Sequence, residues 1–348
     1  MKIVFGGDVM PGGVLYRQDK FIDEEVSCYL KKADTCVYTL ECAVGEEPSG
    51  EVSSPNVVYA RECDFWRLEK LNTTHVSLAN NHVFDMGLEG FQRLTALLRD
   101  RGIMYFGAGM NKVEASQPAV IYAEEKTFAL YGCSIEGLPP VRYPVAEENS
   151  PGVFCASVEE MCDLISLGKQ KYDCVYVLPH WGKEYQTLPL AECVNYSKRM
   201  IDAGADGVFG SHTHCVQPTI IYKGSPIYFS LGSFLFPDVI VKPQRCLTYP
   251  PKAVSSDEFD TCVNYPKKVN RVTMAKWSES SRCSKLVEID TRSGKWRTVF
   301  TDLRFDNVVS FLSRKKTWHL KTKLVIGSGI VRLPNYLRFR MAYYKHIQ

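Results

Sequence analysis

The sequence lacks any long hydrophobic run. No segment reaches the roughly 20 consecutive apolar residues that span a bilayer, and acidic Asp8 interrupts the N-terminal stretch too early for a signal peptide. None of the 13 cysteines forms a Cys-x-x-Cys pair, which argues against a cysteine-ligated zinc site. Without a secretion signal we expect reduced thiols and a cytoplasmic chain, either free or peripheral at a membrane.

Neither glycine, proline nor internal repetition is in excess, so collagen-like and low-complexity classes are excluded. The 348 residues, with 45% hydrophobic and 23% charged residues, are typical of a globular protein. The net charge of +3 is unevenly distributed. Residues 304–348 contain ten Lys or Arg and one acid, Asp306, which leaves −6 for residues 1–303. We predict a domain over residues 1–303 and a basic C-terminal tail over residues 304–348.

The basic tail suggests an anionic partner. It could lie on an anionic membrane surface, bind an acidic envelope-synthesis partner, or remain solvated and partly disordered. Gly327, Gly329 and Pro334 argue against one continuous helix in this region. We expect no nucleic acid as a partner, because no recognised binding module occurs in the sequence.

Short apolar segments run repeatedly into polar residues in the first two-thirds of the chain. These segments, typical of buried strands, cover residues 2–5, 36–40, 75–79, 175–178 and 207–209. Between them, amphipathic patterns predict helices over residues 90–101, 158–167 and 191–203. Alternating strands and helices predict an α/β layered fold, in which ligands gather at the strand ends.

The rhythm changes after Pro218. Residues 219–236 and 286–300 each predict a hairpin, with turns near Gly224 and Gly294. Between them, residues 237–284 are polar and carry scattered prolines, so we expect an irregular insertion, either a lid or a surface excursion.

Polar side chains at the predicted strand ends form the candidate site. They combine carboxylate, amide and imidazole groups, which suit one or two divalent ions of Zn, Mn or Fe. The candidate metal ligands are Asp8, Glu41, Asn81, His180, His212 and His214.

Individually each of these residues also has a structural interpretation. Asp8 could cap a turn and Glu41 could be solvated, whereas the two glycines before Asp8 would allow an ion or phosphate to approach closely. His212 and His214 lie two residues apart, so in an extended backbone both imidazoles point to one side. His180 could equally be a half-buried structural histidine.

The segment around His82 predicts the catalytic group. His82 faces the substrate in this interpretation, and Asp85 orients its imidazole and raises its basicity. Asn80, Glu184 and Tyr185 are predicted to contact the substrate, although a structural role is open for each.

Six segments in order (GDVM, TLE, ANNHVFDMG, LPHWGKEY, GSHTH and SLGSF) resemble the capsule synthesis protein CapA family over residues 1–236. That family is similar to the calcineurin-like metallophosphoesterases, which implies a layered α/β/β/α sandwich. The resemblance implies that Asp8 and His214 serve one metal and that Glu41 bridges. It implies that His82, held by Asp85, is the acid or the group that polarises the substrate. It implies that the second metal is served by three residues: Asn81, His180 and His212.

Met10 stands where the superfamily often has a histidine, which leaves a single-ion site open, and Thr39 and Ser233 replace residues that are often Asn. The resemblance implies a metal-dependent, phosphoesterase-like hydrolase acting on an anionic small molecule or polymer, in capsule or poly-γ-glutamate synthesis. A non-hydrolytic component of polymer synthesis, such as a ligase or export partner, and a binding scaffold with a degenerate site remain alternatives.

Overall fold

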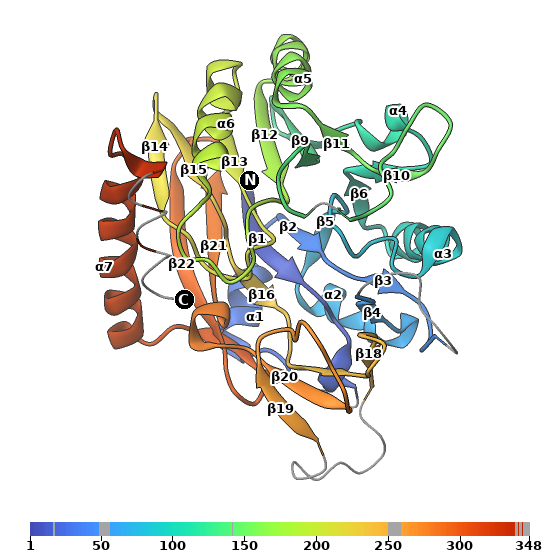
Figure 1. Ribbon diagram of the computed structural model, residues 1–348. Helices are drawn as coiled ribbons and strands as arrows, with labels where there is room; N and C mark the ends of the chain where they lie inside the picture. Colours follow the sequence, from blue (N-terminus) through green and yellow to red (C-terminus); the bar gives the residue numbers. More distant parts are fainter. Residues whose placement is uncertain are drawn as a thin grey trace.

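Two β-sheets packed face to face form the centre of the computed structural model (Figure 1). The structure describes residues 1–16, 18–48, 56–140, 142–249, 259–337, 340 and 343. Helices cover the outer face of each sheet, so the chain has four layers in the order α/β/β/α. The layered sandwich that the resemblance implied is therefore confirmed.

The main sheet has a parallel half and an antiparallel half. Its parallel strands are β1 (Lys2–Val9), β2 (Thr35–Leu40), β5 (Thr73–Ser77) and β6 (Met104–Phe106), with the short β16 (Ser233–Leu235) beside the end of β1. Its antiparallel strands are β21 (Cys283–Asp290), β22 (Trp296–Leu303) and β23 (Val309–Phe311). Because β1 lies in the middle, its C-terminal end is enclosed on both sides.

The second sheet is mostly parallel. It contains β8 (Ala119–Ala123), β9 (Lys126–Ile135), β11 (Cys155–Ala156), β12 (Cys174–Pro179), β13 (Gly207–Phe209), β14 (Thr219–Tyr222) and β15 (Ser225–Tyr228). Two small ladders lie outside the sheets: β3 (Ala43–Val44) with β4 (Tyr59–Ala60), and β7 (Ala108–Gly109) with β10 (Gly152–Val153).

Three apolar clusters hold the layers together. Between the sheets, Phe5 of β1 stacks on Phe209 of β13 with ring centroids 4.2 Å apart. The outer face of the main sheet is covered by α1 (Glu24–Leu30), α2 (Trp66–Lys70) and α3 (Gly87–Asp100). The second sheet is covered by α5 (Val158–Lys171) and α6 (Ala191–Asp202), and α4 (Lys112–Ala115) packs beside β7. The three predicted helices correspond to α3, α5 and α6.

The two predicted hairpins have different outcomes. Residues 286–300 form the antiparallel pair β21–β22, as expected. Residues 219–236 form a hairpin only in their first part, β14–β15. The chain then crosses to the main sheet, where Ser233 of β16 pairs with Asp8 of β1. A local pattern could not reveal this crossing, because the partner of β16 lies more than 200 residues away.

The segment after β16 is ordered, which corrects the expectation of an irregular insertion. Its described part forms a four-stranded sheet of β17 (Val239–Val241), β18 (Leu247–Thr248), β19 (Asp260–Val263) and β20 (Thr273–Lys276). The buried guanidinium of Arg282 donates to an Asp238 carboxylate oxygen (2.5 Å) and to the Trp277 carbonyl oxygen (3.1 Å), which ties this sheet to β21. Residues 250–258 of the insertion lie outside the described residues.

The predicted tail contributes to the fold. The last strand of the main sheet, β23, lies beyond residue 303, and the helix α7 (Arg314–Val331) packs against β14. Its backbone continues through Gly327 and Gly329, so the glycines do not interrupt it. The helix ends at Val331, three residues before Pro334, so the region does not form one continuous helix, as expected. A Cβ atom on Gly327 would lie 2.6 Å from Pro218 Cγ, so glycine lets the helix approach β14 closely. Residues 338–339, 341–342 and 344–348 of the tail lie outside the described residues.

No helix among the described residues combines the length and the apolar character needed to pass through a membrane.

The glycines before Asp8 make room for other parts of the chain, which corrects the expectation that they make room for an ion. A Cβ atom on Gly7 would lie 1.6 Å from the Gly232 carbonyl oxygen, which accepts a hydrogen bond from the Asp8 amide at 3.1 Å. A Cβ atom on Gly6 would lie 2.5 Å from the Tyr38 ring. The glycines therefore allow β16 and the core to close around the end of β1.

Gly7→Ala should destabilise the protein by about 3 kcal/mol, because the new methyl group overlaps backbone that cannot move aside easily. The matched control is Gly329→Ala, in a helix position with no heavy atom within 4 Å of a new Cβ. It should be neutral or stabilise by up to about 1 kcal/mol through helix propensity. Chemical denaturation measures both, and equal stabilities would contradict the close approach.

A lysine is buried between the sheets without a carboxylate partner in any described hydrogen bond or ion pair. Lys285 Nζ donates to the Gln217 carbonyl oxygen at 2.6 Å and to Thr219 Oγ1 at 2.8 Å. Burial lowers the pKa of Lys285 to about 7. The folded protein therefore releases this proton well below the pH at which an unfolded lysine does, about 10.4.

Because the unfolded state binds the extra proton between these two pH values, the contribution of Lys285 to stability should rise with pH. The free energy of unfolding of wild type relative to Lys285→Met should increase from pH 7 to pH 9 by about 1 kcal/mol per pH unit. Urea denaturation at several pH values measures this difference. A difference between wild type and Lys285→Met that does not change with pH would contradict the lowered pKa of Lys285.

Candidate metal centre

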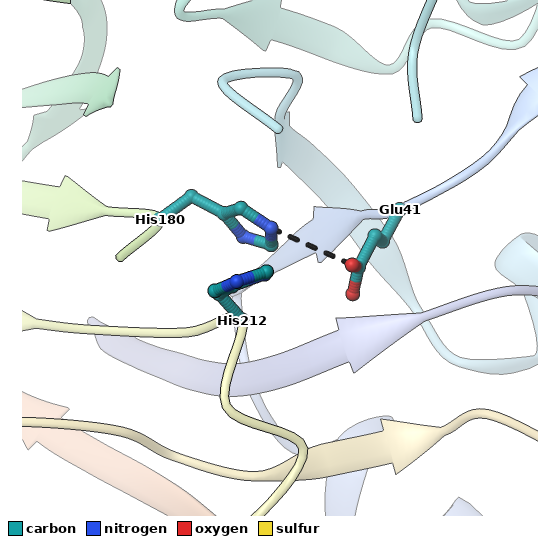
Figure 2. A group of neighbouring side chains, drawn as sticks. All are labelled: Glu41, His180 and His212. Atoms are coloured by element: carbon teal, nitrogen blue, oxygen red, sulfur yellow. Dashed lines mark ion pairs between the residues drawn. The ribbon is translucent and has the colours of Figure 1, made fainter. Parts of the chain in front are cut away.

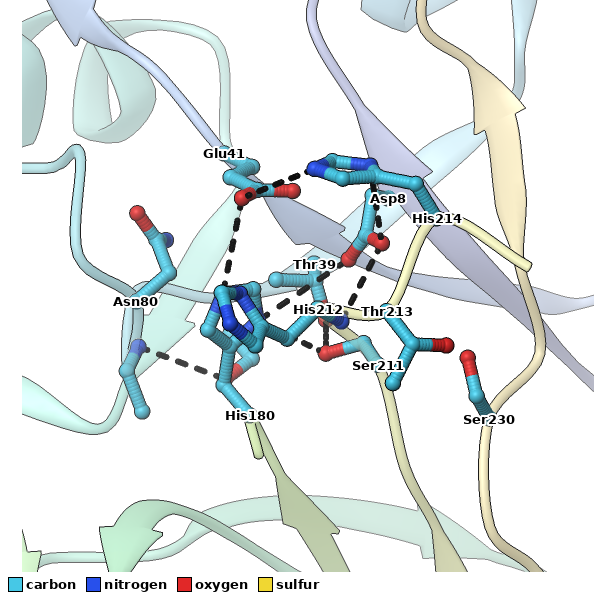
Figure 3. Close-up of polar contacts among 12 residues, drawn as sticks. Asp8, Thr39, Glu41, Asn80, His180, Ser211, His212, Thr213, His214 and Ser230 are labelled. Atoms are coloured by element: carbon cyan, nitrogen blue, oxygen red, sulfur yellow. Dashed lines mark hydrogen bonds and ion pairs between the residues drawn. The ribbon is translucent and has the colours of Figure 1, made fainter. Parts of the chain in front are cut away.

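The six predicted ligands meet where the C-terminal ends of strands from both sheets come together. Asp8 lies near the end of β1 and Glu41 directly follows β2, whereas Asn81 comes from the loop after β5. His180 follows β12, and His212 and His214 follow β13 in the second sheet. Strands far apart in the sequence thus bring buried carboxylate and imidazole groups into one site (Figure 3), with the half-buried Asn81 amide beside it.

Glu41 lies at the centre of the ligand geometry. Its Oε1 is 3.5 Å from His180 Nε2 and 3.7 Å from His214 Nε2 (Figure 2 shows the first pair). Two groups each place one ligand atom per residue within 4.8 Å of one another: Glu41 with His180 and His212, and Asp8 with Glu41 and His214. Asn81 Oδ1 lies 3.0 Å from His180 Nε2, beside the first group. Glu41 is shared, so the arrangement can accommodate two neighbouring ions.

Several polar atoms in this site are buried without a hydrogen-bond partner. They are Asp8 Oδ1, both carboxylate oxygens of Glu41, and His212 Nδ1. A buried, unsatisfied polar atom costs about 1–3 kcal/mol, and a charged one costs more. Two carboxylates and three imidazoles form a donor set that a divalent cation would satisfy. The residues present therefore fit a metal ion.

The protonation equilibria agree with this fit. Burial raises the pKa of Asp8 well above its usual range and raises that of Glu41 to about 8. Burial also lowers the pKa of His180 to about 4 and that of His214 to about 3, and the pKa of His212 falls well below its usual value. The imidazoles are therefore neutral, the form that ligates a metal, and a cation between the carboxyl groups would restore their charge.

Serine hydroxyls orient the imidazole rings. Ser211 Oγ lies 2.8 Å from His180 Nδ1, and Ser233 Oγ lies 2.9 Å from His214 Nδ1. Each contact leaves the Nε2 atom of the ring directed toward Glu41. Partners of this kind usually fix the tautomer and orientation of metal ligands.

The histidine loop is not extended, contrary to the expectation from its spacing. His212 and His214 have φ angles of +87° and +51°, in the left-handed region that costs a residue with a side chain about 1–3 kcal/mol. The His212 amide donates to Asp8 Oδ2 at 3.2 Å, which helps to hold this turn. The imidazoles therefore converge because the loop is bent, with ring centroids 6.4 Å apart.

His82 lies beside the ligand group and is held by Asp85. Its Nδ1 is 2.6 Å from Asp85 Oδ2, which also accepts a hydrogen bond from the Val58 amide at 2.7 Å. Burial lowers the pKa of His82, but the charge and hydrogen bond of Asp85, together with Glu41 and Glu184, outweigh it and raise the pKa to about 9. Asp85 thus orients His82 and raises its basicity, and the catalytic role of the pair stays a prediction.

The model of the bacterial capsule synthesis protein PGA_cap family matches residues 2–238, about two-thirds of the chain. The chain belongs to the PGA_cap family. All of the predicted ligands lie within the matched residues.

Named relatives of this PGA_cap chain include two from Bacillus. The PGA biosynthesis protein CapA of Bacillus subtilis (strain 168) is 31% identical over 169 residues, which cover 49% of this chain and 44% of that protein. The capsule biosynthesis protein CapA of Bacillus anthracis is 27% identical, covering 66% of this chain and 58% of that protein. The chain spans about half the length of these relatives.

Solved structures similar to this PGA_cap chain include a hypothetical protein from Thermus thermophilus, with a TM-score of 0.48, 14% identity and coverage of 87% of this chain and 99% of that chain. A phosphatase from Mycoplasma pneumoniae has a TM-score of 0.47 and 11% identity, and the match covers 93% of this chain and 98% of that chain.

The three predicted substrate residues have different surroundings. Asn80 is buried, donates from Nδ2 to the Leu40 carbonyl oxygen at 2.8 Å and accepts from the His82 amide at 3.0 Å, so it stabilises the loop that carries His82. Burial raises the pKa of Glu184, against the opposing charges of His82 and Arg245. Their contacts with substrate stay predictions.

The third residue, Tyr185, connects the insertion to the site. Its hydroxyl accepts a hydrogen bond from the Tyr265 amide at 3.2 Å, and its ring stacks on His214 with centroids 6.0 Å apart. Trp277, which follows β20, stacks on the same imidazole at 5.5 Å. The insertion therefore encloses the histidine loop with aromatic rings.

Sequence reasoning missed the residues that support the ligands. Ser211 adjoins His212 in the sequence, so a search for hydroxyl groups beside the ligands could have found it. Trp277 and Arg245 had no such signal, because the insertion reaches the site only through the tertiary fold. Met10, at the position where the superfamily often has histidine, is buried, and its sulfur accepts a hydrogen bond from the Gly12 amide at 3.2 Å.

A test of the metal centre that does not depend on activity uses stability. With Mn²⁺ at about 100 times its dissociation constant, wild-type protein should gain about 2.7 kcal/mol. Glu41→Gln should lose most of this gain because Glu41 belongs to both ligand groups, whereas the metal-free variant should be as stable as wild type or more so. Thermal unfolding with Mn²⁺ and with chelator measures both effects.

The matched control is Glu184→Gln, which also removes a carboxyl group near the site but lies outside both ligand groups. It should keep the metal-dependent gain. If Glu41→Gln gained as much from Mn²⁺ as wild type, the assignment of this centre would be wrong.

Proposed function

We propose that this chain is a divalent-metal-dependent, phosphoesterase-like hydrolase. The observation that carries the proposal is the set of buried, unpaired donor atoms around Glu41, shared by two possible ligand groups. Without a bound ion, these unpaired buried atoms would lower the stability of the folded protein by several kcal/mol. A metal-binding function explains why the site nevertheless contains them.

In this proposal Asp8, Glu41, Asn81, His180, His212 and His214 hold one or two ions. When bound, a divalent cation supplies Lewis-acid polarisation of a phosphoryl or acyl oxygen and neutralises the buried carboxylates. His82 keeps its proton at neutral pH because of Asp85 and donates it from Nε2 to the leaving oxygen. Ser211 and Ser233 keep the imidazole ligands in a fixed orientation.

The biological role is proposed from the family and its relatives. The family model covers all six proposed ligands, and relatives of this chain are named for capsule and PGA biosynthesis, so we infer a role for the hydrolase in the synthesis of poly-γ-glutamate or a related envelope polymer. Its substrate would be an anionic small molecule or polymer. The cationic His82 and the nearby Arg245 support an anionic substrate.

Purified protein loaded with Mn²⁺ or Zn²⁺ should hydrolyse a generic aryl phosphate or phosphodiester. His82→Ala should lower kcat by about 10²- to 10⁴-fold, the usual contribution of a general acid, with little change in bound metal. Asp85→Asn should lower kcat less, and should shift the basic limb of the pH–rate profile to lower pH because His82 loses its charged partner.

Steady-state kinetics and elemental analysis on the same samples separate catalysis from metal loss. His82→Gln, which keeps a polar side chain but cannot carry the proton, is the matched variant and should behave like His82→Ala. Full activity of either variant would contradict the role given to His82.

A second candidate is a non-hydrolytic component of polymer synthesis. Met10 favours this candidate, because it stands where the superfamily often has a histidine ligand. Its sulfur accepts a hydrogen bond from the Gly12 amide. The two candidates are separated by measuring phosphate release in the presence of γ-glutamyl products. A metal-loaded protein that releases no phosphate from any tested ester or anhydride would favour the second.

A further inference from the structure

The outer face of α7 combines exposed apolar and basic side chains. Trp318, Val325 and Ile326 are 69%, 71% and 59% exposed, and Leu333, just after the helix, is 48% exposed. Such a group of large apolar side chains on one helix is costly in water unless something covers it. Figure 1 shows α7 standing along the outside of the molecule, beside β14 and β22.

The opposite face of the helix is already occupied. The half-buried and buried positions recur three or four residues apart and face the domain: Thr317, Leu320, Leu324, Gly327 and Val331. Ser328 Oγ fixes this face by donating to the Thr219 carbonyl oxygen at 2.8 Å. The exposed apolar residues therefore cannot turn inward without breaking this docking.

Basic residues flank the apolar stripe on both sides. Lys323 and Arg332 are exposed and nine residues apart, which places them on opposite sides of the helix axis at 100° per residue. The helix Arg314–Val331 contains no Asp or Glu, although Lys316 pairs with Asp302 of β22 at 2.8 Å. Lys315, eleven residues before Ile326, lies nearly in line with it, so the exposed face combines apolar and basic groups and has no acidic group.

We propose that this face of α7, defined by Trp318, Val325, Ile326 and Leu333 with the flanking Lys323 and Arg332, lies on an anionic lipid surface. An apolar stripe bordered by basic groups is the pattern of a helix that lies in the plane of a bilayer interface, with the aromatic ring at headgroup level. A second copy of the chain fits less well, because it would bring two acid-free basic helices together.

The distribution of charge along the chain also supports an anionic lipid surface as the partner of α7. Residues 1–303 carry a net charge of −6, so an anionic surface repels most of the molecule and attracts only the region beyond residue 303. The protein should therefore bind with α7 toward the lipid.

Vesicle co-sedimentation of the full-length chain tests the proposal. Binding is expected to vesicles of equal parts phosphatidylcholine and phosphatidylglycerol, to weaken with salt, and to be absent with phosphatidylcholine alone. Lys323→Gln/Arg332→Gln should lower the partition coefficient about 25-fold, about fivefold for each charge. Val325→Ser/Ile326→Ser should lower it on the order of tenfold.

Matched controls carry the same changes on other exposed surfaces. Val113→Ser/Leu167→Ser and Lys31→Gln/Lys32→Gln should bind like wild type. Circular dichroism checks that each variant is folded, and hydrolysis of an aryl phosphate in solution should be the same for wild type and the α7 variants. This keeps a failure of membrane binding separate from a failure of the proposed activity.

The fluorescence of Trp318 reports which face meets the lipid. Brominated lipid in the anionic vesicles should quench wild-type emission. Trp318→Phe should remove most of that quenching, because Trp318 is the most exposed tryptophan, whereas Trp181 and Trp277 are buried and Trp66 and Trp296 are half-buried. No binding to anionic vesicles, equal binding to neutral ones, or equal losses in the controls would overturn the proposal. So would an α7-dependent dimer, or capture of an acidic protein, with no vesicle binding.

Discussion

The buried carboxyl groups of Asp8 and Glu41 impose the strongest constraint on this structure. Three of their four oxygens have no hydrogen-bond partner, and burial raises the pKa of both groups. A buried negative charge is tolerated only near compensating positive charge. The imidazoles of His180, His212 and His214 are neutral, so besides the cationic His82 the proposed metal ion would supply this charge.

The rest of the fold serves to bring these groups together and keep water out. The two sheets meet through Phe5 and Phe209, which sets the ends of β1 and β13 side by side. Gly7 and Gly232 let β16 close against β1, so Ser233 reaches His214. The insertion then covers the histidine loop with Trp277, and the buried Arg282–Asp238 pair anchors it. Each of these contacts joins residues far apart in the sequence.

The two proposed functions lie on different parts of the molecule. Hydrolysis belongs to the junction of the sheets, and lipid binding belongs to α7 on the outside. The helix docks against β14, which follows the histidine loop in the chain, so both parts share a rigid frame. Docking on lipid would therefore orient the metal centre relative to the membrane surface.

Much of the candidate site could be read from the sequence. Strand-end polar residues and six ordered motifs pointed to the ligands and to the His82–Asp85 pair, because strand propensity, turn chemistry and ligand type are local properties. The bend of the histidine loop, the strands of the insertion, the path of β16 and the continuity of α7 through Gly327 were not predictable in this way. Each of them depends on a partner that the chain meets only when folded. These partners are Asp8 for the His212 amide, Arg282 for the insertion through Asp238, Gly7 for β16 and Pro218 for α7. The sequence alone determined which chemical groups are available. Tertiary packing decided how they are placed, because a close contact depends on the shapes of both segments that meet.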